Sequence, residues 1–191
     1  MNALVFIIDT LLSLALYAFL LRLLMQWSRA DFRNPVSEAI VRLTNPLVMP
    51  LRRVLPPVRK VDSATVLSIV IIALLEVTIQ ILVRGFALPP ALWVARLAAV
   101  AIADAVLRIY LYAILLYAVL SLIAPGGYSP VQSLLVSLCE PVLRPIRRTT
   151  RTIARRMNLP PLGGLDLSPL WACIIIGALL ILLHDMAPAV I

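Results

Sequence analysis

The sequence predicts an all-α membrane protein with four transmembrane helices, built as two parallel tandem repeats that each carry a basic amphipathic cytoplasmic connector. The first reason is composition: 62% of the 191 residues are apolar, 14% are charged, and the mean hydropathy is +1.03. Soluble domains are about 45–50% apolar. A soluble fold has too little interior to bury so much apolar surface, so much of it must face lipid. Composition therefore argues against soluble enzymes, disordered chains and disulfide scaffolds.

The second reason is the presence of four long apolar stretches, because a helix that spans a bilayer needs about 20 mostly apolar residues. We expect spans over residues 5–26, 64–83 and 168–183, and a long third span that ends near Ile123 and begins between Leu92 and Asp104. No basic residue precedes the first apolar run, and no small-x-small cleavage site follows it. We therefore expect the first span to be retained rather than removed as a signal peptide.

The third reason is an internal duplication. Residues 5–53 and 100–148, which are offset by 95 positions, share 17 identities over 49 ungapped positions, among them Asp9 with Asp104. After nine additional residues in the second copy, Asp62 aligns with Asp166. Matches of proline, arginine and aspartate do not arise from two apolar segments that align by chance. We divide the chain into repeats 1–90 and 91–191. Each contains two spans, so both must insert in the same direction, about a two-fold axis along the membrane normal.

The basic residues predict the topology. Residues 28–63 and 124–167 connect the two spans of each repeat, and each segment has a net charge of +4, whereas the rest of the chain is neutral overall. The positive-inside rule places both connectors in the cytoplasm and both termini on the opposite, periplasmic side.

Each connector opens with a capping residue and a proline, which is favourable at the first position of a helix. A short amphipathic helix is expected to follow, and to end or kink at Asn45-Pro46 in one copy and at Glu140-Pro141 in the other. An acidic residue then precedes each returning span, where the helix dipole favours it as an N-cap. The expected caps are Asn34, Asp62, Ser129 and Asp166.

Two segments resemble a known family. Residues 20–57 read LLRLLMQWSRADFRNPVSEAIVRLTNPLVMPLRRVLPP, and residues 140–169 contain EPVLRPIRR followed by GGLDLSP. Both are similar to the YggT family of small bacterial membrane proteins, whose relatives in Gram-positive bacteria and chloroplasts are called YlmG. The resemblance covers nearly the whole chain and implies a bacterial inner membrane location. It further implies roles in osmotic-stress tolerance and potassium uptake, in division and envelope organisation, and, for plastid relatives, in nucleoid distribution and cytochrome maturation.

The two copies also differ. The first connector contains Gln-Trp-x-Arg-Ala-Asp-Phe over residues 26–32, whereas the second copy has Ser-Leu-Ile-Ala-Pro-Gly-Gly over residues 121–127. We therefore expect the two connectors to differ in their roles.

Charged residues within the predicted spans are candidate functional residues. At about 1.5 Å per residue, Glu76 and Arg108 lie at one depth, roughly 20 Å from the cytoplasmic side, which predicts an ion pair between them. Asp104 lies one turn from Arg108 and could compete for it. Such a pair would hold two helices together or form part of an ion or proton path. Asp9 and Asp104 could bind a cation or share a proton, or be solvated residues at the helix starts. Arg22 is expected to snorkel to the cytoplasmic interface.

The basic residues of the connectors predict binding to anionic phospholipid, because each one near an anionic leaflet contributes about 1 kcal/mol. A protein partner, including a second copy of the chain, remains an alternative. Nucleic acid is disfavoured, because the aromatic side chains used for base stacking are not interleaved with the basic ones. The arginines concerned are Arg42, Arg52, Arg53, Arg144, Arg147, Arg148, Arg151, Arg155 and Arg156.

Few residues favour catalysis. The single histidine, His184, has no cysteine or second histidine at the spacing of metal ligands. Cys139 and Cys173 match no disulfide or metal pattern and are expected to be free thiols. The sequence at 163–166 lacks the second glycine of the intramembrane aspartyl-protease motif GxGD, and no CxxCH haem-attachment motif occurs. We therefore expect no cofactor, no metal and no enzymatic activity.

The expected function is that of a multi-pass organising factor for the envelope, for division or for a membrane complex, linked to osmotic stress. Its basic connectors would bind lipid and partner proteins. The alternative is a subunit of an ion (potassium) transport system that uses the intramembrane Asp, Glu and Arg residues. Four helices are few to enclose a pore, so transport would require an oligomer or a partner protein.

Overall fold

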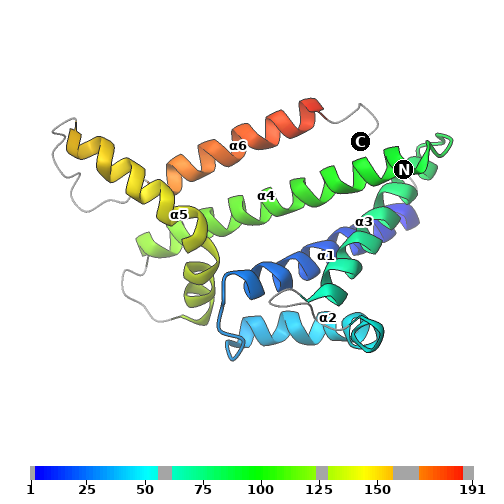
Figure 1. Cartoon of the computed structure of the whole chain (residues 1–191), viewed down its shortest axis with the longest axis horizontal. Helices are drawn as coiled ribbons and strands as arrows, with labels where there is room; N and C mark the ends of the chain where they lie inside the picture. The colour runs from blue at the N-terminus through cyan, green and yellow to red at the C-terminus, as the bar shows by residue number, and fades with distance from the viewer. Residues whose placement is uncertain (1–2, 56–61, 124–128, 157–167, 187–191) are drawn as a thin grey trace.

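The computed structural model describes residues 3–55, 62–123, 129–156 and 168–186, and these residues form six α-helices. The helices are α1 (Ala3–Trp27), α2 (Pro35–Val54), α3 (Ser63–Val83), α4 (Ala91–Ile123), α5 (Pro130–Arg156) and α6 (Ser168–Met186). Four of them, α1, α3, α4 and α6, are long and apolar enough to cross a membrane, which confirms the expected number and positions of the spans. Figure 1 shows the axes of α1, α4 and α6 similarly inclined, with the chain in α6 running opposite to that in α1 and α4, and α3 inclined across them.

The spans pack through one stripe of each helix and leave the remaining apolar surface exposed. On α1 the buried stripe contains Leu16, Leu20 and Leu24, which follow one another every four residues. On α4 it contains Ala98 and Ala105, and side chains this small let neighbouring helices approach closely. Large apolar side chains elsewhere on the spans are exposed. This is the arrangement expected for helices whose other faces contact lipid.

Both connector helices continue through internal prolines. Of the two outcomes expected at Asn45-Pro46 and Glu140-Pro141, an end or a kink, the end does not occur, because α2 includes Pro46 and Pro50, and α5 includes Pro141 and Pro145. Each proline removes one backbone hydrogen bond and displaces the preceding turn, so a proline inside a helix bends it. Figure 1 shows α5 changing direction along its length. The expected kink is therefore seen in α5, whereas α2 continues through its prolines.

The two connector helices begin side by side. Asn34 occupies the N-cap position of α2, where its Oδ1 accepts a hydrogen bond from the backbone N–H of Val36 at 2.9 Å. Its Nδ2 donates to the backbone oxygen of Pro130, the first residue of α5, at 2.6 Å. Ser129 directly precedes α5, and its carbonyl accepts from Ser133 N–H at 3.0 Å. Both connectors therefore lie at one end of the bundle.

Equivalent helices of the two halves make equivalent contacts. α3 packs on α1 as α6 packs on α4, α2 contacts α1 and α3, and α5 contacts α4 and α6. The halves meet through α3 with α4, α1 with α4, α2 with α5, and α1 with α5. Within the described residues α6 makes no contact with α1, although α3 packs on α4. The arrangement therefore departs from a complete two-fold symmetry.

Candidate functional site

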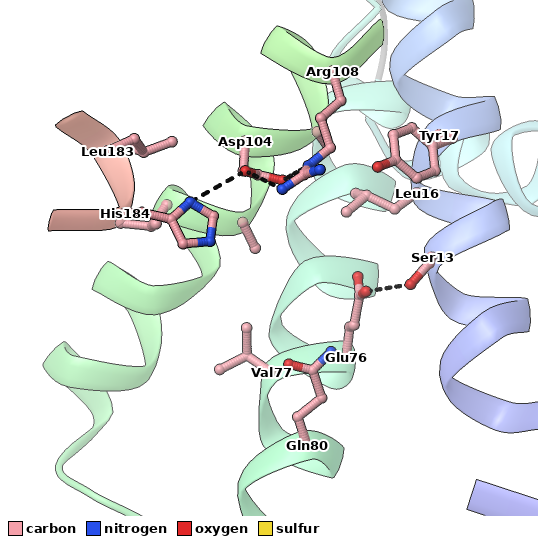
Figure 2. Close-up of a pocket in the computed structure, with 13 residues that line it drawn as sticks. Ser13, Leu16, Tyr17, Glu76, Val77, Gln80, Asp104, Arg108, Leu183 and His184 are labelled. Atoms are coloured by element: carbon pink, nitrogen blue, oxygen red, sulfur yellow. Dashed lines mark hydrogen bonds and ion pairs between the residues drawn. The ribbon is translucent and has the colours of Figure 1, made fainter. Parts of the chain in front are cut away.

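A cavity of about 320 Å³ lies between all four candidate spans (Figure 2). Its lining residues Gln80 and His184 lie close to the ends of α3 and α6 that are away from the connectors. All four spans contribute polar side chains to its lining: two each from α1, α3 and α4, and one from α6. Its polar lining consists of Ser13, Tyr17, Glu76, Gln80, Asp104, Arg108 and His184. Polar groups inside a membrane protein typically face such a cavity or pair with one another.

Glu76 on α3 is the buried acid of this cavity, with a residue exposure of 8%. Its Oε1 accepts a hydrogen bond from the Ser13 hydroxyl on α1 at 2.6 Å. Its Oε2 is fully buried and has no hydrogen-bond partner among the described residues. A buried carboxylate oxygen without a partner costs free energy. Oε2 of Glu76 is therefore an acceptor that lacks a hydrogen-bond donor.

The predicted ion pair between Glu76 and Arg108 is wrong. Arg108 Nε donates to Asp104 Oδ2 at 2.6 Å, and Arg108 Nη2 donates to Asp104 Oδ1 at 3.2 Å. Both residues lie on α4, four positions apart, so the helix itself brings the two charges together. Asp104, the competing partner expected from the sequence, thus forms the ion pair with Arg108. His184 Nδ1 on α6 lies 3.9 Å from Asp104 Oδ1.

Asp9 and Asp104 are each engaged within their own repeat. Gln80 Nε2 on α3 donates to Asp9 Oδ1 on α1 at 2.9 Å. In the repeat alignment, Gln80 corresponds to His184, which approaches Asp104. Each half thus places a polar residue near the end of its second span close to the aspartate of its first. This correspondence was not predicted, although the shift of nine positions after the insertion indicates it.

A second polar cluster lies at the connector end and is buried. Arg22 Nη1 on α1 donates to Thr44 Oγ1 at 2.7 Å and to Asn45 Oδ1 at 2.9 Å, both on α2. Arg22 Nη2 lies 3.9 Å from Asp62 Oδ2, and the Arg22 residue is 5% exposed. The expectation that Arg22 snorkels is therefore wrong. The long α2 folds back against α1 and α3, so the guanidinium finds its partners inside the protein.

Asp62 is the acceptor at the centre of this cluster. It stands at the N-cap position of α3, but its side chain makes no capping hydrogen bond. Its Oδ2 instead accepts from Arg52 Nη2 at 2.5 Å and from Thr65 Oγ1 at 2.7 Å. Burial raises the pKa of Asp62, but the hydrogen bonds from Arg52 and Thr65 outweigh it, so the pKa lies below its usual value. The hydrogen bond to Asp62 in turn raises the pKa of Arg52.

The second repeat builds the equivalent contact with different residues. Arg147, which aligns with Arg52, donates to Tyr117 Oη at 3.2 Å and to Glu140 Oε2 at 3.3 Å. Tyr117 aligns with Arg22, and Glu140 aligns with Asn45. Asp166, the partner expected from the alignment with Asp62, lies outside the described residues. In both halves the first arginine of the pair thus holds the connector helix to the rest of the protein.

The remaining predicted connector arginines differ in exposure. Arg42 and Arg144 are exposed and pair with an acid on their own helix, Glu38 at 2.7 Å and Glu140 at 3.3 Å. Arg53 and Arg148 occupy equivalent positions, are exposed, and have no partner among the described residues. The side chains of Arg151, Arg155 and Arg156 lie outside the described part of the chain.

Comparison with known proteins places these features in a family. The chain matches the family described as CCB3/YggT over residues 1–83 and 97–187, one segment for each half. The YggT protein of Escherichia coli K12 is 35% identical over 170 residues, which cover 89% of this chain and 83% of that protein. The PA0392 protein of Pseudomonas aeruginosa is 37% identical over 176 residues, covering 90% and 83%. A Vibrio alginolyticus protein is 36% identical over 174 residues, covering 89% and 87%. No solved structure matches the chain.

Proposed function

The chain belongs to the CCB3/YggT family, and from this premise we propose that it is a non-enzymatic organising protein of the bacterial inner membrane. Its two connector helices lie against the cytoplasmic leaflet and bind anionic phospholipid. There they present a surface to membrane, division or assembly proteins, in a role linked to the envelope and osmotic stress. A second copy of the chain is one such partner.

The observation that carries this proposal is that the two arginines of each duplicated pair differ in their contacts. Arg52 and Arg147 are bonded to groups of the protein, whereas Arg53 and Arg148 are exposed and have no partner among the described residues. The first arginine of each pair is thereby committed to the protein, and the second is left available to a ligand. Two exposed arginines beside an anionic leaflet contribute about 2 kcal/mol, which is roughly a 30-fold change in lipid affinity.

The lipid-binding proposal is tested by counting phosphatidylglycerol molecules retained on the purified protein by native mass spectrometry. The double variant Arg53→Gln/Arg148→Gln should lose retained phosphatidylglycerol, with affinity lowered by roughly 30-fold. The matched control is Arg42→Gln/Arg144→Gln, which removes two exposed arginines that already have acidic neighbours. Equal losses in the two double variants would contradict the proposal.

The topology belongs to the same proposal: two parallel repeats, cytoplasmic connectors and periplasmic termini. It is supported by the contact between α2 and α5 and by the net charge of +4 on each connector. Alkaline phosphatase fused to either terminus should be active and green fluorescent protein at the same sites should be dark. Fluorescence at either terminus would overturn the topology.

A subunit of an ion (potassium) transport system is the second candidate function. It is favoured by the polar cavity around Glu76. Arg108 pairs with Asp104 there, so Glu76 has no basic partner among the described residues. Potassium flux into proteoliposomes that is abolished by Glu76→Gln would favour this candidate over the organising role.

A further inference from the structure

We propose that the cavity between the four spans is a binding site for a small organic cation, whose primary ammonium group is held by the carboxylate of Glu76. The inference goes beyond the organising role, because that role uses the opposite end of the bundle. It rests on the hydrogen bonds, charges and shape of the cavity.

The first argument is the unsatisfied oxygen. Glu76 is 8% exposed, its Oε1 already accepts from Ser13, and its buried Oε2 has no partner among the described residues. What this atom lacks is a hydrogen-bond donor. An ammonium group supplies three N–H donors and no acceptor, and a bond between ionised groups is stronger than one between neutral groups. A primary ammonium therefore fits the missing contact.

The second argument is charge. The cation of the cavity, Arg108, is already bonded to Asp104 through two of its nitrogens. The carboxylate of Glu76 is consequently without a counter-charge in the cavity lining. Asp9 lies beyond Gln80, to which it is hydrogen-bonded, and adds a further negative charge near the cavity. A site with this balance attracts a cation and repels an anion.

The third argument is the remainder of the lining. The amide nitrogen of Gln80 donates to Asp9, which leaves its carbonyl oxygen as an acceptor in the cavity. Figure 2 shows the Tyr17 hydroxyl directed toward the same space as the Glu76 carboxylate. Between these polar groups lie apolar side chains, including Leu16 and Val77. They provide contacts for the carbon skeleton of an organic cation.

Size favours an organic cation over a bare metal ion. A water molecule occupies about 30 Å³ of liquid, so the cavity volume of about 320 Å³ exceeds what one dehydrated ion fills. It matches the lower end of pockets for small organic ligands, which begin at about 300 Å³. An acceptor cluster on one side and an apolar wall on the other suit a molecule with a charged head and a short carbon chain.

The first test measures ligand-dependent thermal stability of the full chain in nanodiscs. A ligand that binds only the folded state raises the midpoint of unfolding in a concentration-dependent manner. n-Propylammonium chloride should raise it, whereas 1-propanol, which has the chain without the charge, should not. Tetramethylammonium chloride, which has charge without N–H donors, and potassium chloride at equal ionic strength should have at least tenfold weaker effects. An equal response to potassium would identify a site for a bare ion and overturn the proposal.

The second test uses variants and a chemical probe on the same preparation. Glu76→Gln should abolish the propylammonium response, and the matched control Glu38→Gln, on the exposed face of α2, should retain it. If Glu76→Gln does not fold, chemical labelling of the wild-type chain decides the question.

Dicyclohexylcarbodiimide adds to a protonated buried carboxyl group, and the adduct rearranges to an N-acylurea without releasing a leaving group. Propylammonium should slow this labelling of Glu76 at least fivefold and 1-propanol should not. Labelling that is unaffected by propylammonium would refute the site.

Discussion

Replacing Asp62 with asparagine should cause a large loss of stability, because Asp62 is the buried acceptor between two arginines. Its side chain is 2% exposed, and that of Arg22 is 7% exposed, whereas that of Arg52 is 42% exposed. Removing one partner of a buried ion pair costs about 3–5 kcal/mol, since the other charge remains buried without compensation. Arg52 can turn toward water, so the loss falls mainly on Arg22.

The assay is unfolding of the purified protein in mixed detergent micelles, followed by circular dichroism during SDS titration. Asp62→Asn should lower the free energy of unfolding by about 3 kcal/mol or more. Arg52→Gln should cost about 1 kcal/mol or less, because its side chain is partly solvated. Adding Arg22→Leu to Asp62→Asn should recover part of the loss, because the stranded charge is removed.

The control is Glu38→Gln, which breaks an exposed pair on α2 and should change the free energy of unfolding by about 0.5 kcal/mol or less. If Asp62→Asn costs no more than this control, the buried network does not hold the connector. If the losses of Arg22→Leu and Asp62→Asn simply add, the two residues are not coupled, and the assignment of Arg22 to this network is refuted.

Three further predictions follow from the same region and its counterpart. Because the folded-state pKa of Asp62 lies below its usual 3.8, its stabilising contribution is complete above about pH 4 and is lost as the pH falls through the lowered pKa; acid titration of unfolding should show this loss in the wild type and not in Asp62→Asn. Burial raises the pKa of Cys139 to about 12, so in a Cys173→Ser background iodoacetamide at pH 9 should label Cys139 only after denaturation, as read by mass spectrometry. Asn34→Ala removes a helix cap and the bond to the start of α5, and should lower the free energy of unfolding by about 1–3 kcal/mol; a value within error of wild type would exclude that junction as a structural contact.

The spans could be predicted from sequence because bilayer thickness alone selects apolar stretches of about 20 residues. The same reasoning put Glu76 and Arg108 at one depth but did not identify their partners. Depth along the membrane normal is one coordinate, whereas a contact also requires that the two side chains face each other. Glu76 and Arg108 line one cavity, as equal depth suggested, but Asp104 sits one turn from Arg108 on the same helix and forms the pair. Local spacing on a helix was therefore the stronger predictor.

Tertiary contacts account for the errors in the connectors. A residue followed by proline, as in Asn45-Pro46, favours ending a helix when it is considered alone. However, α2 and α5 pack along neighbouring helices that stabilise the turns beyond the prolines. The packing of α2 against α1 brings Thr44 and Asn45 to Arg22, which lies near the end of α1. No local pattern in the sequence specifies that meeting. The sequence therefore predicted an interfacial position for the Arg22 side chain, although that side chain is buried.

The divergence of the two connectors implies that salt affects them differently. Around Arg22 and Asp62 the charges are buried, whereas the side chains of Arg147 and Glu140 are 21% and 35% exposed and lie 3.3 Å apart. Salt screens exposed charges over a Debye length of about 10 Å at 0.1 M and about 3 Å at 1 M, but screens buried pairs much less. Raising sodium chloride from 0.1 M to 1 M should therefore speed amide hydrogen exchange in α5 around Arg147 several-fold and leave α2 around Asn45 nearly unchanged. Equal acceleration in both helices would mean that the exposed and buried contacts contribute alike, and the distinct roles assigned to the two connectors would have no physical basis.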